Sequence, residues 1–163
     1  MARPDELVVT PSVLDRLIDL EPRQAEDSPS TRAQSVRRLR TAVRRDLEWQ
    51  LNTRRNPDEA PESLAELSQS VYNYGLPDFS AVSLNSPKDR GWLLVEVERT
   101  VALFEPRLKD VRVTLLDEPG VNRALHFQIE GMLQMDPAPE QVSFDTVLQL
   151  TNGEYQIRGD RGA

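Results

Sequence analysis

The sequence predicts an α+β fold, in which N-terminal helices pack on one face of a C-terminal antiparallel meander sheet with an open sheet edge. Segments with helical spacing of apolar residues come first in the chain, and segments with alternating apolar residues follow them. Helices and strands segregated in this way are typical of α+β domains. The length of 163 residues suits one hydrophobic core. We therefore expect a single domain over 1–163, with flexible tails at 1–9 and 159–163 and a linker-like spacer at 22–34.

The first predicted helix is short and begins near Ser12. Thr10 or Ser12 can cap it, and Pro11 suits a first turn, where the missing N–H has no helical partner to lose. Pro22 ends it, because the residue before a proline is driven out of the helical conformation. The apolar residues of this segment form one face: Val13, Leu14, Leu17, Ile18 and Leu20.

The longest predicted helix spans 31–52. Its apolar residues recur at helical spacing and form one stripe: Val36, Leu39, Val43, Leu47 and Leu51. Six arginines lie between residues 32 and 45. Trp49 falls outside the stripe, so we expect it to pack against a different element or against a partner.

Two further helices are predicted in the middle of the chain. The first is short and covers 62–70. The second begins at Ser86, with Pro87 in the first helical position, and ends at Glu105 before Pro106. Between the two helices, 71–78 is irregular but rich in aromatic and apolar residues, so we expect it to pack on the core.

The rest of the chain alternates as strands do. Apolar residues recur at every second position over 111–116, 125–135 and 142–150, and a last strand begins at Tyr155. Asn152 and Gly153 form a typical hairpin turn. Gly131 marks a candidate bulge within the second of these strands.

Charge and composition exclude several classes of function. The net charge of −7 argues against nucleic acid and against anionic membrane surfaces as partners, since both require a basic surface. The chain has no cysteine and no apolar run of bilayer length, and it begins without a signal pattern, so we expect a cytoplasmic protein without membrane insertion. His126 is the only histidine and falls on the outward parity of its strand, so we expect no metal, no cofactor and no catalytic triad.

Glu105-Pro106-Arg107 is the most informative short segment. A carboxylate at a helix C-terminus faces the negative end of the helix dipole, which costs roughly 0.3–1 kcal/mol. Physical chemistry leaves two interpretations open. Either Pro106 stops the helix while Glu105 and Arg107 form a local ion pair, or both charged residues serve contact with a partner.

Three stretches in chain order carry a resemblance to a known family: 11–17 with 21–22, then 35–38 with 45–54, then 70–78 with 104–108. They resemble TssE, the baseplate subunit of type VI secretion systems. The first stretch resembles the N-terminal part of that family, the second its long helix, and the third its middle. TssE is related to the contractile-phage baseplate wedge protein that carries a Glu-Pro-Arg motif, and the family has carried a lysozyme-like label.

The resemblance implies a non-enzymatic structural component of the baseplate, assembled at the inner face of the cell envelope. It implies partners among wedge subunits (TssF, TssG and TssK-like) and sheath subunits (TssB/TssC-like), the latter by strand addition to an open sheet edge. It also implies that Glu105, Pro106 and Arg107 contact the helical core bundle of the wedge.

Other functions stay open. The nearest is a baseplate subunit of a phage tail or a related contractile particle, and another is an acidic adaptor of unrelated function. A peptidoglycan-degrading, lysozyme-like enzyme would need two carboxylates across a cleft, and the chain offers many candidates without fixing their distances: Glu96, Glu98, Glu105, Asp110, Asp117, Glu118 and Glu130. The arginines of 32–45 suggest a solvated face or docking to an acidic protein neighbour rather than nucleic acid.

Overall fold

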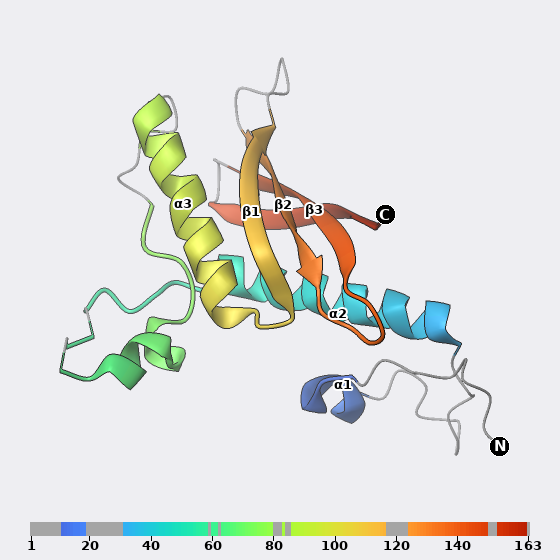
Figure 1. Ribbon diagram of the computed structural model, residues 1–163. Helices are drawn as coiled ribbons and strands as arrows, with labels where there is room; N and C mark the ends of the chain where they lie inside the picture. The colour runs from blue at the N-terminus through green and yellow to red at the C-terminus, as the bar shows by residue number, and fades with distance from the viewer. Residues whose placement is uncertain are drawn as a thin grey trace.

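The computed structural model describes residues 11–18, 31–58, 60–61, 63–79, 83, 86–116, 124–149 and 153–162. Helices come first and strands last, which confirms the predicted α+β class (Figure 1). The α-helices are α1 (Val13–Leu17), α2 (Arg32–Asn52) and α3 (Pro87–Phe104), with 3₁₀ helices η1 (Ala65–Gln69) and η2 (Val71–Asn73) between α2 and α3. The strands are β1 (Leu108–Leu116), β2 (Ala124–Leu133), β3 (Glu140–Gln149) and β4 (Glu154–Gly162). Among the described helices, none is long and apolar enough to cross a bilayer.

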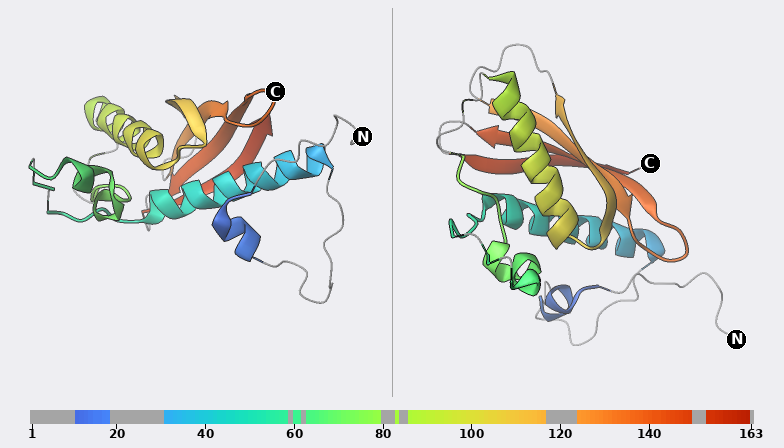
Figure 2. Two further views of the ribbon diagram at one scale, coloured as in Figure 1. Left: turned by 60° about the horizontal axis from the view of Figure 1, so that its bottom comes forward. Right: turned by 60° about the vertical axis from the view of Figure 1, so that its left-hand side comes forward.

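The sheet is an antiparallel meander in the order β1-β2-β3-β4. The long helix α2 crosses beneath the sheet, and α3 lies along β1 (Figure 2). Buried residues of both helices form one core with one face of the sheet, as predicted. They include Leu39, Val43, Leu47 and Leu51 of α2, Leu93, Val97 and Val101 of α3, and Leu108, Leu125, Phe127, Ile129, Leu133, Val142, Phe144, Leu148, Tyr155 and Ile157 of the strands. Val36 of the predicted stripe is only partly buried and is not among them.

Side-chain caps fix where the first two helices begin. The hydroxyl of Ser12 accepts from the N–H of Asp15, so Ser12 is the cap of α1 and Pro11 lies before the cap rather than in the first turn. Thr31 and Gln34 form a reciprocal capping box at the start of α2. Residues 31–34 of the expected spacer therefore belong to this helix start, while 22–30 lie outside the described residues.

The middle of the chain differs in part from the prediction. Residues 65–69 form a 3₁₀ helix with no buried residue, where we expected an α-helix over 62–70. The irregular stretch that follows does reach the core through Leu76, which is buried. Leu76 donates its N–H to the carbonyl of Thr53 over 2.9 Å, which ties this stretch to the end of α2.

Two features of the strands also differ from the prediction. The bulge lies in β1, where Asp110 has φ 52 and the register shifts between Lys109 and Arg112, directly across from Gly131. A glycine suits that position because an added Cβ would lie 3.2 Å from the Lys109 carbonyl oxygen. The last strand continues to Gly162, paired with Val142, rather than ending before a tail at 159–163.

His126 faces away from the core side of the sheet, as its parity predicts, but it is buried rather than exposed. Its neighbours across the two adjoining strands are Leu116 and Val147, both apolar. At the last hairpin, Asn152 lies outside the described residues. Gly153 has the positive φ that the turn requires, and its N–H donates to the carbonyl of Gln149 over 2.8 Å.

Candidate partner-contact site

The site lies where α3 passes into β1. Glu105 is the C-cap of α3, and its N–H donates to the carbonyl of Val101. Its own carbonyl accepts from the N–H of Leu108, the first residue of β1, over 3.1 Å. Pro106 stands at the tip of this tight turn and is exposed, whereas Leu108 is buried in the core. The chain therefore reverses over three residues, as expected for a proline directly after a helix end.

Arg107 turns back onto Glu105 with a forked geometry. Its Nε donates to Oε1 of Glu105 over 2.6 Å and its Nη2 donates to Oε2 over 2.5 Å. The backbone N–H of Arg107 donates to the same carboxylate over 3.2 Å. Glu105 is only 4% exposed, so its charge is compensated inside the protein. Parallel pairing of a guanidinium with a carboxylate is the strongest arrangement available to these two groups.

The same guanidinium also reaches α2. Nη2 of Arg107 donates to Oδ2 of Asp46 over 2.6 Å. Oδ1 of Asp46 accepts from Arg45, whose Nη2 also donates to Asp15 of α1 over 2.9 Å. We call the five residues Asp15, Arg45, Asp46, Glu105 and Arg107 the ion network. It joins α1, α2 and the start of β1 through alternating charges.

The network shifts the pKa values of its members. Burial alone would lower the pKa of Arg107, but hydrogen bonds and the charges of Glu105 and Asp46 outweigh it and raise that pKa well above its ordinary value. Burial opposes ionisation of Asp15, yet the Ser12 hydroxyl and Arg45 lower its pKa on balance. At Tyr74, burial and the nearby charges of Asp46 and Glu105 raise the pKa of the hydroxyl. The shifts at Arg107 and Asp15 favour ionised side chains at neutral pH, and the shift at Tyr74 keeps its hydroxyl neutral.

Aromatic side chains surround the network. Tyr74 packs edge-on against Phe104, the last residue of α3, with ring centroids 5.4 Å apart. The Arg45 guanidinium lies 5.0 Å from the ring centroid of Trp49, which is 53% exposed. Trp49 is thus outside the core stripe, as predicted, and presents apolar surface beside a network residue.

This arrangement is suited to holding elements together rather than to acid–base chemistry. Each network carboxylate is paired with a guanidinium, so none is a free proton donor or acceptor. Two of the other carboxylates considered for a glycosidase have local roles, since Glu96 pairs with Arg55 and Glu98 accepts from the β1 backbone. Asp117 and Glu118 fall outside the described residues. Within the described part of the chain, no three acidic or histidine side chains gather as metal ligands would.

The structure brings the predicted site residues together with residues that sequence reasoning missed. The local pair of Glu105 and Arg107 is present, and Pro106 is the exposed member of the segment. Asp46 and Asp15 were not expected to join it, and Asp46 lies 61 positions from Arg107. The network draws on all three stretches that carry the family resemblance: Asp15 from the first, Arg45 and Asp46 from the second, Glu105 and Arg107 from the third.

Residues 37–138 match the family model described as "Baseplate wedge protein gp25". The match covers more than half of the chain and contains α3, β1, β2 and most of α2, with every network residue except Asp15. The strands β3 and β4 lie beyond it. No curated protein and no solved structure matches the chain.

Proposed function

The chain belongs to the baseplate wedge protein gp25 family, and on this premise we propose that it is a structural baseplate component of a type VI secretion system. In this role it joins the baseplate wedge, with subunits of the TssF, TssG and TssK kind, and provides a platform for a contractile sheath of TssB and TssC-like subunits. It acts in the cytoplasm at the inner face of the cell envelope, and it is not an enzyme. The three TssE-like stretches favour a secretion system over the alternative, a phage tail or related particle.

The two edges of the sheet support different uses. At β1 the edge lies against α3, and the N–H of Val113 donates to the Glu98 carboxylate over 3.0 Å. At β4 the side chain of Asn52 accepts from the N–H of Tyr155 and donates to its carbonyl, each over 2.9 Å. The C-terminal end of β4 lies clear of both α2 and α3 in every view (Figures 1 and 2). Strand addition by a sheath subunit is therefore proposed at β4, beyond Tyr155.

The ion network supports the proposed contact of Glu105-Pro106-Arg107 with the wedge. Glu105 is buried, so its part in that contact is to hold Arg107 and the turn in one shape. Pro106 is exposed at the tip of the turn and is the member able to touch a partner surface directly. Arg107 gives its Nε and Nη2 to Glu105 and Asp46, so its part in that contact is likewise to hold the turn in place. The observation that carries the proposal is the turn at Pro106, which ion pairs hold in one conformation, in a chain of the wedge family.

A substitution at Pro106 tests the proposed contact while every residue of the network is kept. We expect Pro106→Glu to fold with a melting temperature near that of the native chain, because the side chain is exposed, but to lose co-purification of wedge subunits. The matched control is Pro57→Glu, at an exposed proline in the turn after α2. The proposed contact is wrong if Pro106→Glu recovers wedge subunits as fully as the Pro57→Glu control.

A further inference from the structure

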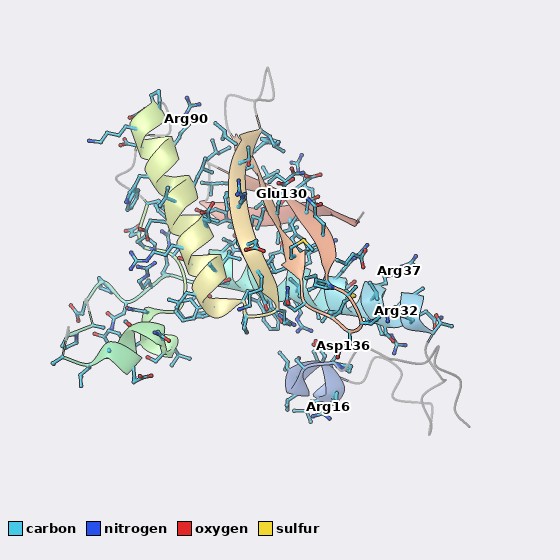
Figure 3. The ribbon with its side chains drawn as sticks, in the orientation of Figure 1. Arg16, Arg32, Arg37, Arg90, Glu130 and Asp136 are labelled. Atoms are coloured by element: carbon cyan, nitrogen blue, oxygen red, sulfur yellow. The ribbon has the colours of Figure 1, made fainter. Side chains whose placement is uncertain are left out.

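A hollow of about 750 Å³ opens beside the N-terminal half of α2. Its lining combines arginines with small or apolar side chains and one acid from the start of β3: Arg32, Ala33, Val36, Arg37, Arg40, Thr41 and Glu140. Figure 3 shows Arg32 and Arg37 together at this end of α2. The hollow lies at the opposite end of α2 from Asn52, and Glu140 in its wall is two residues from Val142, which pairs with Gly162 at the end of β4.

The guanidinium groups of this hollow have unused capacity for anions. Arg40 pairs with Glu140, which shows that a carboxylate fits the wall at that point. Arg32 and Arg37 form no ion pair with any residue that the structure describes. The three arginines lie within nine residues, an axial span of about 12 Å, and Arg40 already holds Glu140, so Arg32 and Arg37 are the two that can each hold a carboxylate of a ligand.

We propose that this hollow binds an acidic amphipathic segment of a neighbouring protein subunit. The arginines would pair with its carboxylates, and Ala33 and Val36 would accept an apolar side chain between them. Charge complementarity selects an acidic ligand. A nucleic acid is disfavoured because the chain as a whole carries −7 and would repel a continuous phosphate backbone. The inference goes beyond the proposed function, since the hollow is a second interaction surface with its own ligand chemistry.

Fluorescence anisotropy on the isolated full chain tests this proposal. The probe is a fluorescein-labelled amphipathic helix made of glutamate, leucine and alanine. We expect it to bind the native chain and to bind the double variant Arg32→Glu with Arg37→Glu on the order of tenfold more weakly. The variant should fold, because Arg37 is exposed and a carboxylate at position 32 favours the first turn of a helix.

The control is the double variant Arg38→Glu with Arg99→Glu, which makes the same change in net charge at two exposed positions outside the hollow. We expect it to change the affinity by less than about twofold, since neither side chain lines the hollow and exposed charges are screened by salt. Equal loss in both variants, or no loss in the first, overturns the proposal. Stronger competition by duplex DNA or by anionic vesicles than by unlabelled peptide also overturns it and makes the hollow a phosphate site. Because the assay contains no other baseplate protein, its result does not depend on the proposed function.

Discussion

Arg107 forms ion pairs with two carboxylates from different parts of the chain, Glu105 beside it and Asp46 on α2. At the scale of single residues, this contact explains why an acid is tolerated at the C-terminus of α3. The unfavourable interaction with the helix dipole is modest, and a forked guanidinium pair offsets it. The two interpretations of Glu105-Pro106-Arg107 that the sequence left open are therefore compatible. The local pair shapes the turn, and Pro106 stays exposed, as the proposed contact with a partner requires.

Removing Arg107 should destabilise the protein strongly. We expect Arg107→Ala to lower the free energy of unfolding by roughly 3 kcal/mol, because Glu105 would keep a buried charge without a partner. This is the low end for breaking a buried pair, since the Arg107 side chain is 23% exposed. Urea unfolding followed by circular dichroism measures it. Arg112→Ala, at an exposed position of the same strand, should stay within about 0.5 kcal/mol of the native chain, and an equal loss there would contradict a special role for Arg107.

Asp15 should make the stability of the network dependent on pH. Its pKa is lower in the folded chain than its ordinary value of about 3.9. Its stabilising contribution is therefore fully present above that value and is lost as pH falls through the folded-state pKa. We expect native and Asp15→Asn chains to differ in unfolding free energy at pH 7 and to converge below about pH 4. A difference that stays constant from pH 7 to pH 3 would show that ionisation of Asp15 contributes nothing.

At the scale of elements, α2 organises the molecule because different parts of it contact different neighbours. Its apolar stripe covers the sheet, Asp46 and Arg45 hold the turn before β1 and the helix α1, and Asn52 holds the edge of β4. Its exit is fixed by Gly75, whose φ of 97 lets the chain pass close to the Thr53 carbonyl. The short helix α1 buries no residue, so its position depends on the ion pair that Arg45 of α2 forms with Asp15.

Two glycine-to-alanine substitutions compare the close approach of Gly75 to the Thr53 carbonyl with an ordinary position inside a helix. At Gly75 an added Cβ would lie 2.3 Å from the Thr53 oxygen, and its positive φ disfavours any side chain. We expect Gly75→Ala to lower the melting temperature clearly, with a cost above about 2 kcal/mol. Gly91→Ala, in α3 with open space around it, should instead stabilise by about 0.5–1 kcal/mol. Differential scanning calorimetry separates the two, and a neutral Gly75→Ala would contradict the described packing.

Periodicity in the sequence predicted α2, α3 and the strands well. Each of these elements buries one face in the core, so its apolar residues repeat with the period of a helix or a strand. The α-helix expected at 62–70 was wrong: residues 65–69 form a 3₁₀ helix in which no residue is buried, so core packing does not stabilise a full α-helix there. Arg107 and Glu105 could be paired from their proximity in the chain. Asp46 could not, because a single sequence carries no signal for a contact between distant positions, and the same holds for Asn52 with Tyr155.

At the scale of the whole molecule, the helices and the sheet leave three surfaces with different chemistry. Ion pairs hold the turn at Pro106 in one conformation. The part of β4 beyond Tyr155 presents a strand edge, and the hollow on α2 is basic. They draw on different elements, so the same chain could contact several neighbours at once. Such a distribution suits a subunit whose role is assembly, and it accords with membership of a baseplate wedge family.

Affinity purification of the tagged full chain from its native cell tests the structural role most directly, with mass spectrometry of the proteins that accompany it. We expect wedge subunits and sheath subunits to co-purify, and the purified chain to leave peptidoglycan intact in a zymogram. Recovery of neither class of protein, together with clearing of the zymogram, would contradict the baseplate role and favour the lysozyme-like enzyme.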